Sequence, residues 1–426
     1  MRKCFLIVLC ILLTMALIGC RVDPSSPTES GCTTAGTTTS TTAHIPSWTT
    51  QPTFVPTSPS TVPTESSVAT EPATQPPSEI DLLLSSMTLR EKVGQLFIVT
   101  PDALETNSEL KKNGVTKVSD SMRQRLEKYP VGGFILFAAN IRDPQQLSAL
   151  NSALQEASAI PAFVCVDEEG GRVARLAKKS KFDLKTYESA MAVGASGDPG
   201  DALEMGSTIG AYLKAYGFNL DFAPVADVYT NPENKVIGNR AFSSDPHIAA
   251  EMVAAMAQGL REHGIIATFK HFPGHGDTAE DSHSGIAVNY KTMAELLVCE
   301  WLPFMEATAR DMIMVGHIAV PEITGDLTPA TLSNTLVTEI LKNQLGFDGL
   351  VVSDSLRMGA ITGEYTPGEA ALLALNAGVD ILLMPASLSA AFDAIVEAVE
   401  DGTFPAEKLD NIVKRILEFK KNHGIL

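Results

Sequence analysis

The sequence predicts an α/β protein built as a (β/α)8 barrel of the TIM type. From about residue 80 to the last residue, short apolar runs rich in β-branched and aromatic residues recur along the chain. Segments with helical spacing separate most of these runs, and polar residues recur where the runs end. Apolar strands that alternate with helices are typical of a parallel sheet covered by helices.

Residues 1–20 are predicted to be a lipoprotein signal peptide. Arg2 and Lys3 precede an apolar run that is too short and too early in the chain for a mature membrane-spanning helix. The run ends in Leu-Ile-Gly-Cys, which resembles the bacterial lipobox, so we expect Cys20 to carry the lipid. An ordinary secretory signal and an uncleaved anchor are the alternatives. We expect an exported lipoprotein on the extracytoplasmic side of a bacterial cell membrane.

Residues 21–79 are predicted to be a disordered tether. Of these 59 positions, 26 are Ser or Thr and 10 are Pro, and there is almost no periodic apolar pattern. Such a segment buries too little apolar surface to offset the entropy lost on ordering. Residues 80–426 are predicted to form one catalytic domain.

Eight apolar runs in this domain match the strand number of a closed barrel. Several of the helical segments between them end at Gly, as helix C-termini often do. An open, doubly wound sheet is the alternative, but no Gly-rich phosphate loop follows the first run. The expected strands are 94–99, 132–137, 162–167, 219–228, 265–272, 312–318, 349–355 and 381–385.

Charge and cysteine content exclude some classes of protein. The formal net charge is −18, which argues against a nucleic-acid partner because phosphate binding needs clustered Lys and Arg. Cys165 and Cys299 fall in apolar segments and are expected to be buried thiols, with no structural disulfide. We expect a monomer.

Charged and titratable residues follow five of the predicted strands. In a barrel the carboxyl ends of the strands converge on one site. Buried charges are costly unless they are paired or used, so this many at one mouth favours an enzyme over a binding-only pocket. The residues at these strand ends are Asp167, Asp227, Lys270, His271, His317 and Asp354.

The segments that carry these residues resemble those of the family 3 glycoside hydrolases. The resemblance rests on VDEEGGRVARL, NLDFAPVADV, GNRAF, KHFPGHGDTAEDSH and VVSDSLRM, and it extends from about Met87 to Met384. It is closest to the single-barrel bacterial β-N-acetylglucosaminidases that act on peptidoglycan. The resemblance implies that Asp354 is the nucleophile and that His283, paired with Asp281, is the acid/base. It also implies that sugar hydroxyls are held by Asp167, Arg175, Arg240, Lys270 and His271.

The chemistry of glycoside cleavage is consistent with these roles. The bond breaks through an oxocarbenium-like state, so one group supplies electron density and another protonates the leaving oxygen. A His has an intrinsic pKa close to neutral pH and needs little tuning for acid/base work. Asp281 would orient the ring of His283 and stabilise its charged form. This chemistry needs no metal and no cofactor.

Other interpretations of the same residues remain open. Asp354 could be a structural cap between a strand and a helix. The run that contains His271, His275 and His283 could be a metal site, although no HExxH or other fixed helical spacing occurs. We interpret His275 as a residue that structures its loop, Glu168 and Glu169 as structural, and His317 as either a wall of the pocket or a core residue.

The function predicted from the sequence is a retaining, exo-acting β-N-acetylglucosaminidase. It would remove terminal β-linked N-acetylglucosamine from peptidoglycan-derived glycans through a covalent intermediate on Asp354. The alternatives are an N-acetylglucosaminide phosphorylase and a β-glucosidase of the same fold. A sugar-binding lipoprotein that feeds a transporter is the alternative that is not an enzyme.

Overall fold

The computed structural model describes residues 77–279 and 285–426. The predicted signal peptide, Cys20 and nearly all of the tether lie outside the described residues, and so do Asp281 and His283. The described residues belong to one compact unit. Within the described ranges, no helix is long and apolar enough to span a bilayer.

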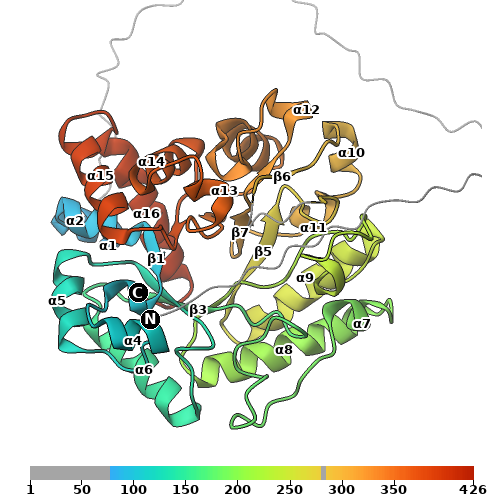
Figure 1. Cartoon of the computed structure of the whole chain (residues 1–426), viewed down its shortest axis with the longest axis horizontal. Coiled ribbons are helices and arrows are strands. Elements are labelled where there is room, and N and C mark those ends of the chain that lie inside the picture. Colours follow the sequence, from blue (N-terminus) through green and yellow to red (C-terminus); the bar gives the residue numbers. More distant parts are fainter. Residues whose placement is uncertain (1–76, 280–284) are drawn as a thin grey trace, which may run out of the picture. The chain divides into compact units, whose positions relative to one another are not determined.

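The unit is a parallel barrel, as predicted. Its strands pair in the order β10-β1-β2-β3-β4-β5-β7-β9, and a parallel bridge between Val352 and Ile381 brings the two ends of this sheet together. Figure 1 shows the strands at the centre of the unit with the helices around them. The barrel strands are β1 (Phe97–Val99), β2 (Gly133–Leu136), β3 (Phe163–Val166), β4 (Leu220–Asp221), β5 (Ile266–Phe272), β7 (Met312–Val315), β9 (Leu350–Ser353) and β10 (Leu382–Leu383).

Each barrel strand falls inside one of the predicted apolar runs, but two runs differ from the prediction. The fourth run forms a regular strand over two residues only, and the chain then continues beside β5 with an isolated bridge between Val225 and Lys270. The sixth run is split. Its last part, with the residue that follows, forms β8 (Ile318–Ala319), which pairs with β6 (Ala287–Val288) in a separate two-stranded sheet.

The helices begin and end where the sequence has capping residues. Helix α6 starts at Pro144 behind Asp143, whose side chain accepts a hydrogen bond from the N–H of Gln146. Helix α14 has a capping box of Thr366 and Glu369. The three helical segments expected from PQQLSALNSALQEA, PHIAAEMVAAMAQGLREHG and PGEAALLALNAG are α6 (Pro144–Ala157), α9 (Pro246–Glu262) and α14 (Pro367–Ala377).

The remaining helices cover the outside of the barrel or lie in the loops that follow the strands. The two longest besides α9 are α8 and α16. The other helices are α1 (Glu79–Ser86), α2 (Leu89–Gln95), α3 (Pro101–Leu104), α4 (Ser108–Asn113), α5 (Asp120–Lys128), α7 (Ala190–Gly194), α8 (Pro199–Ala215), α10 (Met293–Leu297), α11 (Leu302–Met305), α12 (Pro321–Thr324), a π-helix (Thr335–Gln344), α13 (Gly359–Thr362), α15 (Leu388–Glu400) and α16 (Ala406–Asn422).

The core fills the barrel and the layer between its strands and helices. The burial of the β-strand residues explains why they are apolar along their whole length. Cys165 lies in β3 and is buried, as expected, whereas Cys299 is partly exposed, so the prediction of a buried thiol was wrong for Cys299. Cys299 lies in the short segment between α10 and α11, outside the strand layer that encloses Cys165.

Candidate active site

A cavity of about 460 Å³ lies at the carboxyl ends of the barrel strands. This volume is in the range of sites that bind small molecules. Asp281 and His283 lie outside the described residues, so the structure does not place them. The other predicted site residues all line this cavity, namely Asp167, Arg175, Arg240, Lys270, His271 and Asp354.

Asp167 follows β3, and the next residues bring Arg175 back to it. Gly170 and Gly171 have φ angles of 79° and 56°, a region that side chains other than glycine rarely adopt, so the chain can reverse here. Nη2 of Arg175 then donates to Oδ2 of Asp167 over 3.1 Å. The guanidinium of Arg175 also lies over the ring of Phe137, with 5.3 Å from Cζ to the ring centre. The turn therefore pairs two residues that are eight positions apart.

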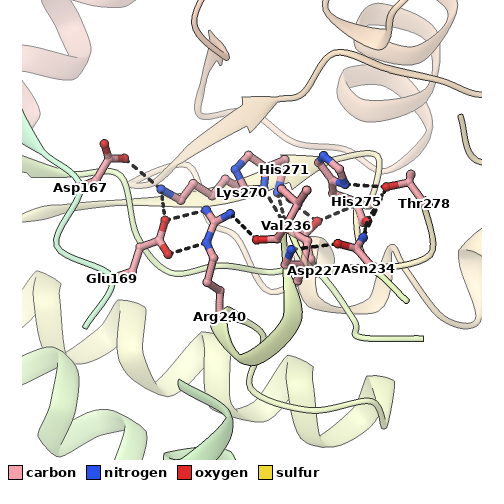
Figure 2. A network of polar contacts seen from close by, with 12 residues as sticks. Asp167, Glu169, Asp227, Asn234, Val236, Arg240, Lys270, His271, His275 and Thr278 are labelled. Atoms are coloured by element: carbon pink, nitrogen blue, oxygen red, sulfur yellow. Dashed lines mark hydrogen bonds and ion pairs between the residues drawn. The ribbon is translucent and has the colours of Figure 1, made fainter. Parts of the chain in front are cut away.

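Lys270 lies at the end of β5 and connects two carboxylates. Its Nζ is 3.0 Å from Oδ1 of Asp167 and 2.6 Å from Oε1 of Glu169 (Figure 2). Burial alone would lower the pKa of Lys270, but the two carboxylates outweigh it and raise that pKa. Lys270 is therefore a cation at neutral pH, held in position by two anions.

Glu169 was predicted to be structural, and the structure pairs its carboxylate with the side chains of Arg240 and Lys270. Its two oxygens accept hydrogen bonds from Nε and Nη2 of Arg240, each over 2.8 Å, and its side chain is only 4% exposed on the cavity wall. Burial raises its pKa, but Arg240 and Lys270 lower it well below the usual range. Its neighbour Glu168 is structural, because its oxygens accept from the backbone N–H groups of residues 175–177.

His271 is held by a buried carboxylate. Nδ1 of His271 lies 2.8 Å from Oδ2 of Asp227, and the other oxygen of Asp227 accepts from the N–H of His275 over 2.6 Å. The carboxylate favours a proton on Nδ1 and fixes the plane of the ring. His275 structures its loop as predicted, since its ring contacts the hydroxyl of Thr278 over 2.7 Å, and it also lines the cavity.

Lys270 and His271 are consecutive in β5, yet both side chains reach the cavity. In a regular strand, neighbouring side chains point to opposite faces. The register between β5 and β7 shifts between Lys270 and Phe272, so the alternation is interrupted at this point. The irregularity therefore explains how one strand supplies two adjacent residues to the same site.

Asp354 follows β9, with its backbone N–H bonded to the carbonyl of Val315 over 2.9 Å. Burial raises the pKa of Asp354, but the charges of His317 and His271, a hydrogen bond from the N–H of Ser355 and the charge of Lys270 together lower it. The N–H of Ser355 donates to Oδ1 over 2.6 Å. Asp354 is therefore an anion at neutral pH, in a fixed position and beside the cavity.

His317 is fully buried behind this strand end and is not part of the cavity wall. Its Nε2 lies 2.9 Å from the carbonyl oxygen of Ser355, and its Nδ1 lies 2.9 Å from the hydroxyl of Thr331. Of the two interpretations left open for His317, the structure supports the core residue. It holds the backbone that follows Asp354.

Metal binding was the alternative interpretation of the His-rich run. In the part of the chain that the structure describes, no group of three or more His, Cys, Asp or Glu side chains is arranged to hold a metal ion. The carboxylates of the site are instead paired with Arg and Lys side chains.

The fold and the cavity define a class of protein. A barrel mouth that combines an ionised carboxylate with several charged hydrogen-bonding groups is suited to a sugar and to chemistry at its glycosidic bond. Residues 88–419 match the family model described as the glycosyl hydrolase family 3 N-terminal domain. The chain belongs to glycoside hydrolase family 3.

Two curated relatives and one solved structure illustrate the similarity. Beta-hexosaminidase A from Pseudoalteromonas piscicida is 33% identical over 336 residues, which are 72% of this chain and 56% of that protein. Beta-hexosaminidase LpqI from Mycobacterium tuberculosis is 34% identical over 358 residues, 81% of this chain and 85% of that protein. The structure of a family 3 β-N-acetylglucosaminidase from Paenibacillus sp. str. FPU-7 superposes with a TM-score of 0.74 at 36% identity, covering 80% of this chain and 63% of that one. The chain thus spans less than two thirds of two of these three proteins.

Proposed function

We propose that the chain is a retaining, exo-acting β-N-acetylglucosaminidase that acts on peptidoglycan-derived glycans. The observation that carries this proposal is the ionised Asp354 in a cavity whose wall also presents Asp167, Lys270 and Arg175. Relatives named beta-hexosaminidase and a solved β-N-acetylglucosaminidase support the choice of sugar.

The binding step uses the paired charges of the site. The carboxylate of Asp167 can accept hydrogen bonds from sugar hydroxyls, and Lys270 and Arg175 can donate to them. Because these groups are already held by one another, they lose little conformational entropy when the sugar binds. A cavity of this size at the bottom of the mouth suits the terminal sugar of a glycan.

The first chemical step forms a bond between a carboxylate oxygen of Asp354 and the anomeric carbon. The bond from that carbon to the leaving oxygen breaks, and His283 gives its proton to this oxygen. In the second step His283 takes a proton from water, and the water oxygen displaces Asp354 from the anomeric carbon. Asp281 would orient the ring of His283 in both steps.

A fluorinated 2-acetamido sugar that traps the intermediate tests this proposal. The trapped sugar should map to the peptide that contains Asp354, and Asp354→Asn should lose on the order of 10³-fold in kcat while remaining folded. Asp348→Asn is a matched control, because Asp348 precedes β9 at its other end and its side chain is 83% exposed. A sugar adduct on any residue other than Asp354 would overturn the assignment.

We also propose that the protein is exported and held at the membrane by a lipid on Cys20. The supporting observations are the charged and apolar leader and the Leu-Ile-Gly-Cys sequence. The Ser, Thr and Pro-rich tether would let a monomeric barrel work at a distance from the membrane. Metabolic labelling with a palmitate analogue should tag the wild-type protein and not Cys20→Ala. Equal labelling of both would show that Cys20 does not carry the lipid.

A further inference from the structure

His317 lies one strand away from the candidate nucleophile. It follows β7, and Asp354 follows β9, the strand that pairs with β7 in parallel. The backbone N–H of Asp354 donates to the carbonyl oxygen of Val315 over 2.9 Å, so the two strand ends are joined directly. The side chain of His317 is fully buried at this position. Neither chemical step of the proposed reaction uses this buried titratable side chain.

The Nε2 atom of His317 donates a hydrogen bond. It lies 2.9 Å from the carbonyl oxygen of Ser355, the residue directly after Asp354. A carbonyl oxygen is an acceptor only, so the hydrogen in this bond belongs to Nε2. This bond also connects the ring of His317 to the backbone that carries Asp354.

The Nδ1 atom of His317 is also a donor. Its partner is the hydroxyl of Thr331 at 2.9 Å, and this hydroxyl lies 2.9 Å from the carbonyl oxygens of both Val315 and Gly316. A hydroxyl has one hydrogen and two lone pairs. Because the two carbonyls accept only, the hydroxyl hydrogen points to them and a lone pair of the hydroxyl oxygen faces Nδ1. With hydrogen on both nitrogens, the ring of His317 is an imidazolium with one positive charge.

A buried cation needs electrostatic compensation, and Asp354 supplies it. Taking a charge out of water is costly unless the charge is paired and hydrogen-bonded. Burial raises the pKa of Asp354, and the charge of His317 comes first among the groups that lower it, ahead of His271 and Lys270. The ring of His317 and the carboxylate of Asp354 therefore stabilise each other's charged form.

We propose that His317 is an imidazolium in the folded enzyme at neutral pH and stabilises the carboxylate of Asp354 as this leaves the sugar. The inference rests on the proposed function, because it takes Asp354 to be the nucleophile. In the second step the water oxygen bonds to the anomeric carbon, the bond from that carbon to Asp354 breaks, and its electron pair returns to the carboxylate. His283 takes the proton of the water. His317 keeps both of its protons, does not line the cavity and acts through Asp354.

The positive charge affects the two chemical steps differently. Asp354 loses negative charge when it bonds to the sugar and regains this charge when it leaves. A cation beside it therefore favours the second step and does not favour the first. An opposite charge nearby lowers the pKa of a carboxyl group by about 1–3 units, and only part of the negative charge has returned at the transition state. We expect His317 to accelerate the second step roughly tenfold.

The fluorinated 2-acetamido sugar allows each step to be measured by itself in the full-length protein. The rate of inactivation by this reagent reports the first step, and the return of activity after removal of the excess reagent reports the second. His317→Gln keeps a donor for the carbonyl of Ser355 but removes the positive charge. We expect this variant to slow the return of activity about tenfold and to leave the rate of inactivation unchanged or higher.

Thr331→Val is a second variant that leaves His317 and its bond to Ser355 in place. Valine has nearly the shape of threonine but offers no acceptor to Nδ1, so a hydrogen bond no longer stabilises the proton on this nitrogen. We expect the same bias toward the second step, with the return of activity slowed about threefold.

His423→Gln is the matched control. The ring nitrogens of His423 also lie near two carbonyl oxygens, that of Phe419 at 2.8 Å and that of Arg310 at 2.9 Å. Arg310 precedes β7, so His423 lies at the amino ends of the strands, opposite to the end that carries Asp354. Both rates should equal those of wild type in this control.

Nuclear magnetic resonance of the protein labelled with nitrogen-15 histidine tests the charge itself. The signals of His317 can be identified by their loss in His317→Gln and by their shift in Thr331→Val. At neutral pH they should show hydrogen on both ring nitrogens. A ring nitrogen of His317 without hydrogen would overturn the inference.

The kinetic outcomes separate this inference from the proposed function. If His317→Gln and Thr331→Val slow both steps by the same factor, His317 only supports the fold, and the inference is wrong while Asp354 remains the nucleophile. Unchanged rates of both steps in these two variants would overturn the inference in the same way. A sugar trapped on a residue other than Asp354 in the wild-type protein would instead overturn the proposed function.

Discussion

Replacing Glu169 by Gln tests whether this residue is the counter-ion that holds the sugar-binding cations in place. Glu169 is 4% exposed and accepts from Arg240 at both oxygens over 2.8 Å, while Nζ of Lys270 lies 2.6 Å from Oε1. The glutamine oxygen can still accept from Lys270 and from Nη2 of Arg240. Its amide would face the Nε–H of Arg240, so two donors would meet where a hydrogen bond existed.

The expected loss in the free energy of unfolding follows from the burial of Glu169. Removing one partner of a buried ion pair costs about 3–5 kcal/mol, because the remaining charge loses its compensation. Here two cations are affected, but Lys270 retains Asp167 at 3.0 Å and Arg240 retains the carbonyl of Val236 at 3.2 Å. We therefore expect Glu169→Gln to lower the free energy of unfolding by about 3 kcal/mol, the lower end of that range.

Denaturant unfolding together with steady-state kinetics is the assay. We expect Glu169→Gln to lower kcat/KM for a nitrophenyl N-acetylglucosaminide at least tenfold, because Lys270 and Arg240 are no longer fixed for binding. Glu204→Gln is the control, since Glu204 pairs with Lys185 on the surface with 64% of its side chain exposed and should contribute little to stability. Equal unfolding midpoints for wild type and Glu169→Gln would refute the counter-ion role.

Three further predictions concern the acid/base pair, a buried lysine and metal dependence. His283→Ala should slow cleavage of a disaccharide far more than cleavage of a nitrophenyl glycoside, because only the sugar leaving group needs a proton, and Asp281→Asn should show a milder form of this bias. If His283→Ala slows both substrates by the same factor, the proton donor must be another residue. Burial lowers the pKa of Lys420 from 10.5 to about 7, so between these pH values the unfolded chain binds more protons and the folded state gains stability as pH rises. The free energy of unfolding of wild type should therefore rise relative to that of Lys420→Met by up to about 1.4 kcal/mol per pH unit in this window and show no such slope below pH 7, whereas parallel pH profiles would contradict the assignment. Activity should survive extensive EDTA treatment, and a loss that zinc alone restores would make the His-rich run a metal site.

Much of the fold could be predicted from the sequence, because its signals are local. Apolar runs of four to eight residues separated by helical spacing identify buried parallel strands without knowledge of their partners. The positions of Asp167, Lys270 and Asp354 near the carboxyl ends of such runs could also be predicted, and the carboxyl ends of the strands of a barrel meet at one mouth. The division of the sixth run between the barrel and a separate two-stranded sheet was not predicted. One continuous apolar segment can supply strands to two different sheets, and its sequence does not show where it divides.

The roles within the site depended on distances that only the closed barrel determines. Glu169 and Arg240 are 71 positions apart, and nothing in their local sequence indicates that they pair. The adjacent Lys270 and His271 share the cavity because of an irregular register with β7, which the sequence pattern does not report.

The sequence by itself determined which side chains stand at the strand ends, because apolar periodicity and chain direction are local properties. The tertiary structure decided which of them compensate one another. Glu169 neutralises two cations from distant segments, Arg240 and Lys270. Electrostatic energy depends on separation and burial in space, and these are set only when the barrel closes.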